Sequence, residues 1–246
     1  MPTQASVPPA FTAVLFGLGG CLVDFGARTQ ALALLRTLPD LSPGLGAVDQ
    51  SPLRALRQAL AREPRTGELQ RLELALVQSA AEHAEATPGA LARLAQLHAQ
   101  GVPCAWLSEL PDDASLRLAQ PLPSWLAPGQ SHRPRPWPAP DACWQALMGL
   151  EVATLDGCVL VSGEPRLLQA GLNAGLWTIG LAVCGSLCGQ GPGDWQALDT
   201  QARDRLRTQA TLALYRLGVH SVIDHLDDLA PGLDDLAARR LAGEKP

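Results

Sequence analysis

The stretch AVLFGLGGCLVDFG, residues 13–26, decides the fold class because an apolar run passes directly into closely spaced glycines. The run is short and uniformly apolar, which predicts a buried strand. Gly17 and Gly19 follow it, an arrangement that also occurs in turns that hold a phosphate. The dinucleotide-binding fingerprint needs a further glycine where this chain has Leu22, and it needs a helix immediately afterwards. The stretch therefore predicts a strand followed by a glycine loop, and it does not favour a dinucleotide site.

Outside this stretch the chain shows two different patterns. Residues 28–100 read as one helix after another, with apolar residues three or four positions apart. From residue 101 onward, strand-like apolar runs alternate with helical segments, which predicts a parallel sheet covered by helices on both faces. We therefore expect a doubly wound α/β core formed by residues 1–26 and 100–246, with a helical cap domain inserted at residues 27–99.

The net charge and the lengths of the apolar runs argue against two classes of partner, nucleic acid and membranes. The 246 residues carry a formal net charge of -5 and show no basic patch, which argues against nucleic acid. No apolar run reaches the about 20 residues that span a bilayer, so we expect no membrane partner. Residues 18–21 match a lipoprotein cleavage box, but no basic residue precedes Arg28, and a signal peptide needs a basic start. We expect a cytoplasmic protein.

The six cysteines lie mostly within apolar segments, which is typical of buried thiols in a reducing compartment. An alternative is a metal site formed by Cys184 and Cys188 together with His220 or His225. The spacing of these residues is loose, so the sequence favours buried thiols.

Several motifs, taken in order along the chain, resemble one enzyme family. Residues 13–26 resemble the first motif of the haloacid dehalogenase (HAD) superfamily, and more closely the D-W-A-G-T-x-V-D-[FY]-G loop of phosphonoacetaldehyde hydrolases, or phosphonatases. Further segments that resemble this family are residues 45–56, 133–138, 159–181 and 217–236. The resemblance covers essentially the whole chain. It implies a HAD-like core with a cap, Mg²⁺ in active relatives, and a homodimer formed through the cap.

The resemblance also implies which positions carry the chemistry, and the chain departs from the family at those positions. The replaced positions are Gly17 for the aspartate nucleophile, Gly19 for a second acid that phosphonatases replace with alanine, Gly163 and Leu167 for acids of the metal-binding motif, and Asp49 for the Schiff-base lysine. The only lysine of the chain is Lys245, next to the C-terminus. We therefore expect no catalytic residues, no bound metal and no cofactor.

Some groups that bind an anion in this family are retained. Ser108 matches a hydroxyl that contacts a phosphoryl oxygen, and Arg133 matches the basic residue of the third motif. Backbone amides around Gly19 and Gly20 could form an anion-binding nest. The alternative, equally weighted, is that Ser108 caps the following segment and Arg133 is a surface arginine. A small anionic ligand is the partner that the retained groups favour.

Three other groups could replace the missing ones. Asp24 and Glu164 are acids close to the replaced positions, and Cys21 stands where the family has threonine. We expect all three to be structural. The leading hypothesis is a catalytically inactive phosphonatase-like protein that acts through binding or assembly. The alternative is an active HAD-type hydrolase of a small phosphonate or phosphomonoester that uses non-standard groups. In either case Gly17, Ser108 and Gly163 should meet at the carboxyl ends of adjacent parallel strands.

Overall fold

The computed structural model describes residues 11–39, 51–129 and 135–246. Its centre is a five-stranded sheet in the order β2-β1-β3-β4-β5, in which every neighbouring pair is parallel. The strands are β1 (Ala13–Gly17), β2 (Cys104–Leu107), β3 (Cys158–Ser162), β4 (Trp177–Leu181) and β5 (Ser221–Ile223). The first strand of the chain lies inside the sheet, with later strands on both sides. This confirms the predicted doubly wound α/β fold.

The interior strand β1 is buried on both faces, and its side chains alternate between two hydrophobic clusters. Val14 and Phe16 belong to the cluster that includes residues of α4 (Ala90–Ala99). Leu15 belongs to the cluster that includes residues of α6 (Asp141–Gly149) and α7 (Pro165–Asn173). This two-residue alternation is the geometry of a strand covered by helices on both sides. It explains why residues 13–16 are all apolar.

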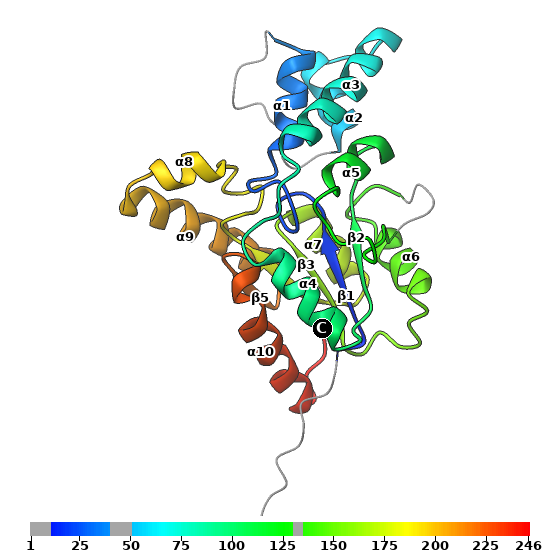
Figure 1. Cartoon of the computed structure of the whole chain (residues 1–246), viewed down its shortest axis with the longest axis vertical. Coiled ribbons are helices and arrows are strands. Elements are labelled where there is room, and N and C mark those ends of the chain that lie inside the picture. The colour runs from blue at the N-terminus through cyan, green and yellow to red at the C-terminus, as the bar shows by residue number, and fades with distance from the viewer. Residues whose placement is uncertain (1–10, 40–50, 130–134) are drawn as a thin grey trace, which may run out of the picture.

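Three helices stand apart from the sheet and form the cap seen at the top of Figure 1. They are α1 (Arg28–Thr37), α2 (Pro52–Leu60) and α3 (Thr66–Glu82). The core helix α5 (Asp112–Leu118), which follows β2, lies beneath them.

Helix α4 packs against the core, although it falls within the segment expected to form the cap. The Arg93 guanidinium on α4 donates a hydrogen bond to the Asp227 carbonyl at 2.9 Å. A side chain at Gly89, directly before α4, would lie 2.2 Å from the Asp227 backbone nitrogen, so the two segments are in close contact. We therefore propose that the cap ends near residue 83 instead of residue 99.

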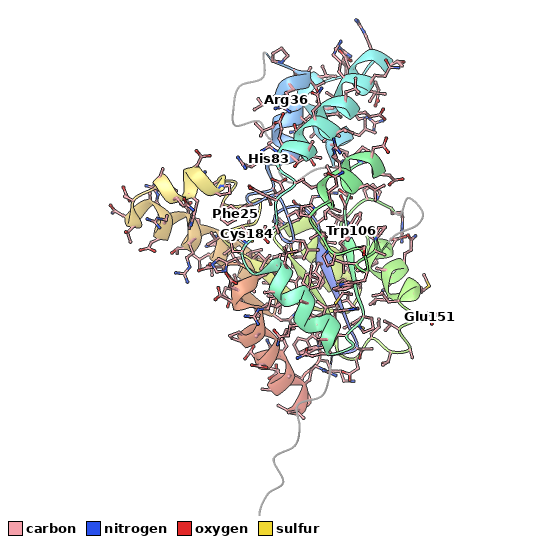
Figure 2. The ribbon with its side chains drawn as sticks, in the orientation of Figure 1. Phe25, Arg36, His83, Trp106, Glu151 and Cys184 are labelled. Carbon is pink, nitrogen blue, oxygen red and sulfur yellow. The ribbon has the colours of Figure 1, made fainter. Side chains whose placement is uncertain are left out.

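The two connections between core and cap run side by side. The Asp24 amide donates to the Glu85 carbonyl at 3.2 Å, and the Thr87 amide donates to the Leu22 carbonyl at 3.0 Å. Figure 2 labels Phe25 on the first connection, and the second lies between α3 and α4. Because the connections are hydrogen-bonded to each other, they hold the base of the cap against the sheet.

The remaining helices complete the core after β4. Helices α8 (Pro192–Ala197) and α9 (Thr200–Leu217) project sideways in Figure 1, and α10 (Leu229–Leu241) packs beside β5 after the short 3-10 helix η1 (Leu226–Asp228). None of the helices in the described ranges is long and apolar enough to cross a bilayer.

Candidate functional site

The candidate site lies at the carboxyl edge of the sheet, where the sequence predicts it. Gly17 ends β1, Ser108 directly follows β2 and Gly163 directly follows β3, and β1 is the strand between the other two. A cavity of about 90 Å³ opens here between the sheet edge and α1 of the cap. Its lining includes Gly17, Leu18, Gly19, Asp24, Thr29, Leu34, Leu107, Ser108, Glu109, Leu110, Leu118, Trp137, Glu164, Arg166 and Leu167.

At Gly17 a side chain would fit only if the Ser162 side chain moved. A Cβ atom built on Gly17 would lie 2.6 Å from the Ser162 hydroxyl oxygen and 3.2 Å from the Ser162 Cβ. The Ser162 hydroxyl itself accepts a hydrogen bond from the Glu164 amide at 3.0 Å. The space for a nucleophile at this position is therefore filled by a side chain that stabilises the start of α7.

A side chain at Gly163 would overlap backbone atoms of neighbouring segments. A Cβ atom on Gly163 would lie 2.3 Å from the Gly20 carbonyl oxygen and 2.4 Å from the Gly185 Cα. Both the amide and the hydroxyl of Ser186 donate to the Gly163 carbonyl at 3.2 Å. Gly20 has a positive φ of 66°, a conformation that glycine adopts without strain. Gly20, Gly163 and Gly185 thus bring three segments of the chain into close contact, because none of them carries a side chain.

Two acids near the cavity each accept hydrogen bonds from the start of a helix. The Asp24 carboxylate accepts from the Arg28 and Thr29 amides of α1, both at 2.9 Å. The Glu164 carboxylate accepts from the Arg166 amide of α7 at 3.3 Å. Carboxylates are favoured at these positions because helix N-termini present free amides and a partial positive charge. Both acids thus have a structural role, as the sequence predicts.

A third acid forms an internal network that the sequence analysis missed. Glu109 and Arg166 form an ion pair at 2.6 Å, and their side chains are only 15% and 13% exposed. The Trp137 amide donates to Glu109 at 2.6 Å, and the Arg166 guanidinium donates to the Trp137 carbonyl. A signal was available, because Glu109 follows Ser108 at the strand end and Trp137 belongs to the segment 133–138 that resembles the family.

These residues do not suit Mg²⁺, which prefers carboxylates and water in an octahedral arrangement. Leu167, where the family has an acid, is fully buried among apolar residues. In the part of the chain that the structure describes, no three His, Cys, Asp or Glu residues form a group that could hold a metal. Cys184 and Cys188 belong to no such group among the described residues and are buried free thiols, the arrangement that the sequence favours. His220 instead accepts a hydrogen bond from the Thr178 amide at 3.0 Å.

Several groups expected to bind an anion already have partners in the protein. The Ser108 hydroxyl accepts from the Leu110 amide at 3.1 Å and from the Ser115 hydroxyl at 3.0 Å. The Gly20 amide donates to the Val23 carbonyl at 2.8 Å, so it is not directed at a ligand. Gly19 lines the cavity. Arg133 and Asp49 lie outside the described residues.

Cys21 does not have the properties of a nucleophile. Its side chain is fully buried, and its thiol donates to the Val161 carbonyl at 3.4 Å. Burial raises the pKa of the Cys21 thiol well above its ordinary value. Because the thiolate is the reactive form, this environment favours an inert structural cysteine, as the sequence predicts.

Comparisons with known proteins agree with this fold. No family model matches the chain. A phosphonoacetaldehyde hydrolase from Bordetella pertussis is 28% identical over 272 aligned positions, covering 99% of each chain. A phosphonoacetaldehyde hydrolase-like protein from Oleispira antarctica superimposes with a TM-score of 0.85 over 100% of both chains at 21% identity. A HAD family hydrolase from Deinococcus radiodurans, solved with bound phosphate and sodium, has a TM-score of 0.61 at 25% identity over 93% of this chain and 96% of its own.

The parallel sheet, the inserted cap and the cleft at the strand ends define a capped α/β protein of the HAD type. The chain belongs to the haloacid dehalogenase superfamily, in its phosphonatase-like branch of hydrolases. The resemblance seen in the motifs is thereby confirmed.

Proposed function

We propose that this protein is a catalytically silent member of the phosphonatase-like branch. The observation that carries the proposal is the closure at Gly163, because a side chain there would overlap the Gly20 carbonyl and the Gly185 Cα, both backbone atoms; a side chain at Gly17 would displace the Ser162 hydroxyl. The departures from the family are thus accompanied by packing that fills the vacated space.

The chemistry that the family resemblance implies needs three kinds of group. A carboxylate attacks the substrate, a metal ion neutralises phosphoryl charge, and a lysine amine activates the aldehyde. Here the first two positions are Gly17 and Gly163, of which Gly163 has no room for a side chain unless backbone moves, and the third is Asp49. Groups that act as a unit fail together, so loss of the nucleophile alone is expected to lower the rate by several powers of ten.

We therefore expect purified protein with millimolar Mg²⁺ to show no turnover of phosphonoacetaldehyde or of p-nitrophenyl phosphate above the buffer background. Isothermal titration with Mg²⁺ should show no one-site binding curve. Turnover above background that Ser108→Ala abolishes would overturn the proposal. That result would favour an active hydrolase that uses non-standard groups, the alternative raised by the sequence.

We also propose that the chain forms a homodimer through the cap. Leu74 on α3 and Leu53 on α2 are 65% and 40% exposed, and a second copy would bury this apolar surface. We expect light scattering at micromolar concentration to give the mass of a dimer. Leu74→Arg should shift it to a monomer, whereas Leu212→Arg on α9, also half-exposed but outside the cap, should not. A monomeric wild-type protein would contradict the proposal.

A cytoplasmic location is part of the same proposal. All six cysteines are buried and free of disulfides, which is typical of proteins in a reducing compartment. Burial raises the pKa of Cys104 and of Cys143 to about 12, so these thiols stay protonated at neutral pH.

A further inference from the structure

We propose that a groove beside the two connections of the cap binds a small organic cation, such as a quaternary ammonium ion, through aromatic side chains and the Glu85 carboxylate. The groove has a volume of about 430 Å³, within the usual range for small-molecule sites. It is separate from the cleft at the strand ends, because the described residues that line the two have no member in common. The inference therefore does not rest on the proposed function.

The groove lies between the two connections of the cap and helix α8. Phe25 lines it from the first connection, Glu85 from the second and Trp195 from α8. The Glu85 carbonyl accepts a hydrogen bond from an amide of the first connection at 3.2 Å. Directly after Phe25, the Gly26 amide donates to the Cys184 carbonyl at 2.8 Å (Figure 2). These hydrogen bonds fix the backbone on two sides of the groove, so the site is formed before a ligand binds.

The first support for a cation is the aromatic lining. Phe25 is 6% exposed and belongs to the main hydrophobic cluster, and the partly buried Trp195 packs against that cluster and against a second one. Aromatic rings attract cations within about 6 Å of the ring centre, and tryptophan does so most strongly. A quaternary ammonium ion suits such a lining, because its methyl groups also contact apolar surface.

The second support is an acid without a partner. Among the described residues, no hydrogen bond or ion pair involves the Glu85 carboxylate, and the residue is exposed. An exposed and unpaired glutamate side chain is free to rotate towards a cation in the groove that it lines. No lysine or arginine is among the described residues that line the groove. Glu85 therefore gives the groove a negative charge that a cationic ligand would neutralise.

The charged groups around the groove do not supply that cation. Arg28 is hydrogen-bonded to a carbonyl of the first connection at 3.3 Å, and Arg93 is hydrogen-bonded to the Asp227 carbonyl at 2.9 Å. Neither arginine lines the groove. His225 does line it, and its Nδ1 lies 3.7 Å from the carboxylates of Asp227 and Asp228. Binding is therefore best measured at mildly alkaline pH, where histidine side chains in general are uncharged.

A matched pair of probes tests the charge requirement directly. Choline and 3,3-dimethyl-1-butanol have the same shape, but a neutral carbon replaces the quaternary nitrogen in the second. We expect choline chloride to shift the Trp195 indole N–H signal in a ¹H–¹⁵N spectrum of the wild-type protein, with saturation in the millimolar range. The neutral alcohol, and sodium chloride as the blank for ionic strength, should leave that signal in place at the same concentrations.

Variants of the acid test its contribution. Glu85→Gln removes the charge at nearly constant shape, and should weaken choline binding about two- to fivefold, the usual value of an exposed charge pair. Glu73→Gln is the matched control, because Glu73 is an exposed acid on α3 that does not line the groove. The control variant should bind choline as tightly as the wild type does.

Variants of the aromatic lining assign the signal and test the ring. Trp195→Phe keeps a ring but removes the indole, so the signal that disappears belongs to Trp195. Trp195→Leu removes the ring and should weaken choline binding about three- to tenfold. Trp144→Leu is the matched control, because Trp144 is 44% exposed on α6 and does not line the groove.

The proposal is overturned if 3,3-dimethyl-1-butanol binds the wild-type protein as tightly as choline does, or if choline leaves the Trp195 signal unmoved at high millimolar concentration. Equal choline affinity of Glu85→Gln and the wild type would also contradict it. The first two outcomes come from the wild-type protein, so a variant that fails to fold does not affect them. Turnover of a phosphorylated or phosphonate substrate would overturn only the proposed function, because that chemistry belongs to the other cleft.

Discussion

Replacing Gly163 with alanine is expected to lower the free energy of unfolding by about 3 kcal/mol or more. The added Cβ would lie 2.3 Å from the Gly20 carbonyl oxygen and 2.4 Å from the Gly185 Cα. Both atoms belong to the backbone, so no side-chain rotation relieves the overlap. To accommodate alanine, the protein must either separate the segments that contain Gly20, Gly163 and Gly185 or lose hydrogen bonds between them.

Gly67→Ala on α3 is the matched control for Gly163→Ala. A Cβ at Gly67 would meet nothing within 4 Å, and alanine is favoured over glycine inside a helix. This variant should be as stable as the wild type or more stable by up to about 1 kcal/mol. Urea unfolding followed by circular dichroism measures both variants. Equal stability of the Gly163 and Gly67 variants would show that the close approach of the three segments is not as tight as described.

The same geometry bears on attempts to restore activity. A Gly17→Asp, Gly163→Asp double variant would carry two carboxylates into space already taken by Ser162, Gly20 and Gly185. An acid at position 163 could be accommodated only if the surrounding backbone moved, whereas an acid at position 17 would require the Ser162 side chain to move. Under the proposed function, the packing around Gly163 would therefore hinder recovery of activity even after both acids are restored.

Much of the fold could be predicted because it depends on local patterns. The apolar run at residues 13–16 predicts a strand buried on both faces, and the alternation of strands and helices predicts the parallel sheet. The location of α4 could not be predicted in the same way. An apolar helix face shows that a helix packs against something, but it does not identify the partner. Here the partner segment contains Asp227, which contacts Arg93 and lies close to Gly89 although it is far along the chain.

The candidate site was predictable in position but not in detail. Strand ends identify Gly17, Ser108 and Gly163, because the carboxyl ends of parallel strands share one edge. The sequence does not reveal that Gly185 closes the space beside Gly163, since glycines distant in sequence give no pairing signal. It likewise does not reveal that Glu109 and Arg166 neutralise each other. Both features arise from tertiary contacts between separate loops.

Asp24→Ala is expected to lower the free energy of unfolding by about 3 kcal/mol at neutral pH, the second large effect. Asp24 is 2% exposed, and its carboxylate accepts from the two first amides of α1. Alanine would leave both amides buried without an acceptor. Asp199→Ala is the matched control, because Asp199 caps the exposed start of α9 by accepting from the Ala202 amide at 2.7 Å. In the Asp199→Ala variant the free energy of unfolding should fall by only about 1 kcal/mol.

The protonation of Asp24 gives this prediction a pH dependence with a definite sign. Burial raises the pKa of Asp24 above its ordinary value of 3.8, although the amides of α1 and nearby His83 oppose the rise. The folded state therefore holds the proton more tightly than the unfolded chain does. The stabilisation that comes from protonated Asp24 is fully present below pH 3.8, and it is lost as the pH rises through the pKa that Asp24 has in the folded protein. Asp24→Asn cannot titrate, so the stability of the wild type relative to this variant should be greater at mildly acidic pH than at neutral pH. Urea unfolding of both proteins across that range measures the difference, and a wild-type advantage that grows with pH would show that the amide hydrogen bonds outweigh burial.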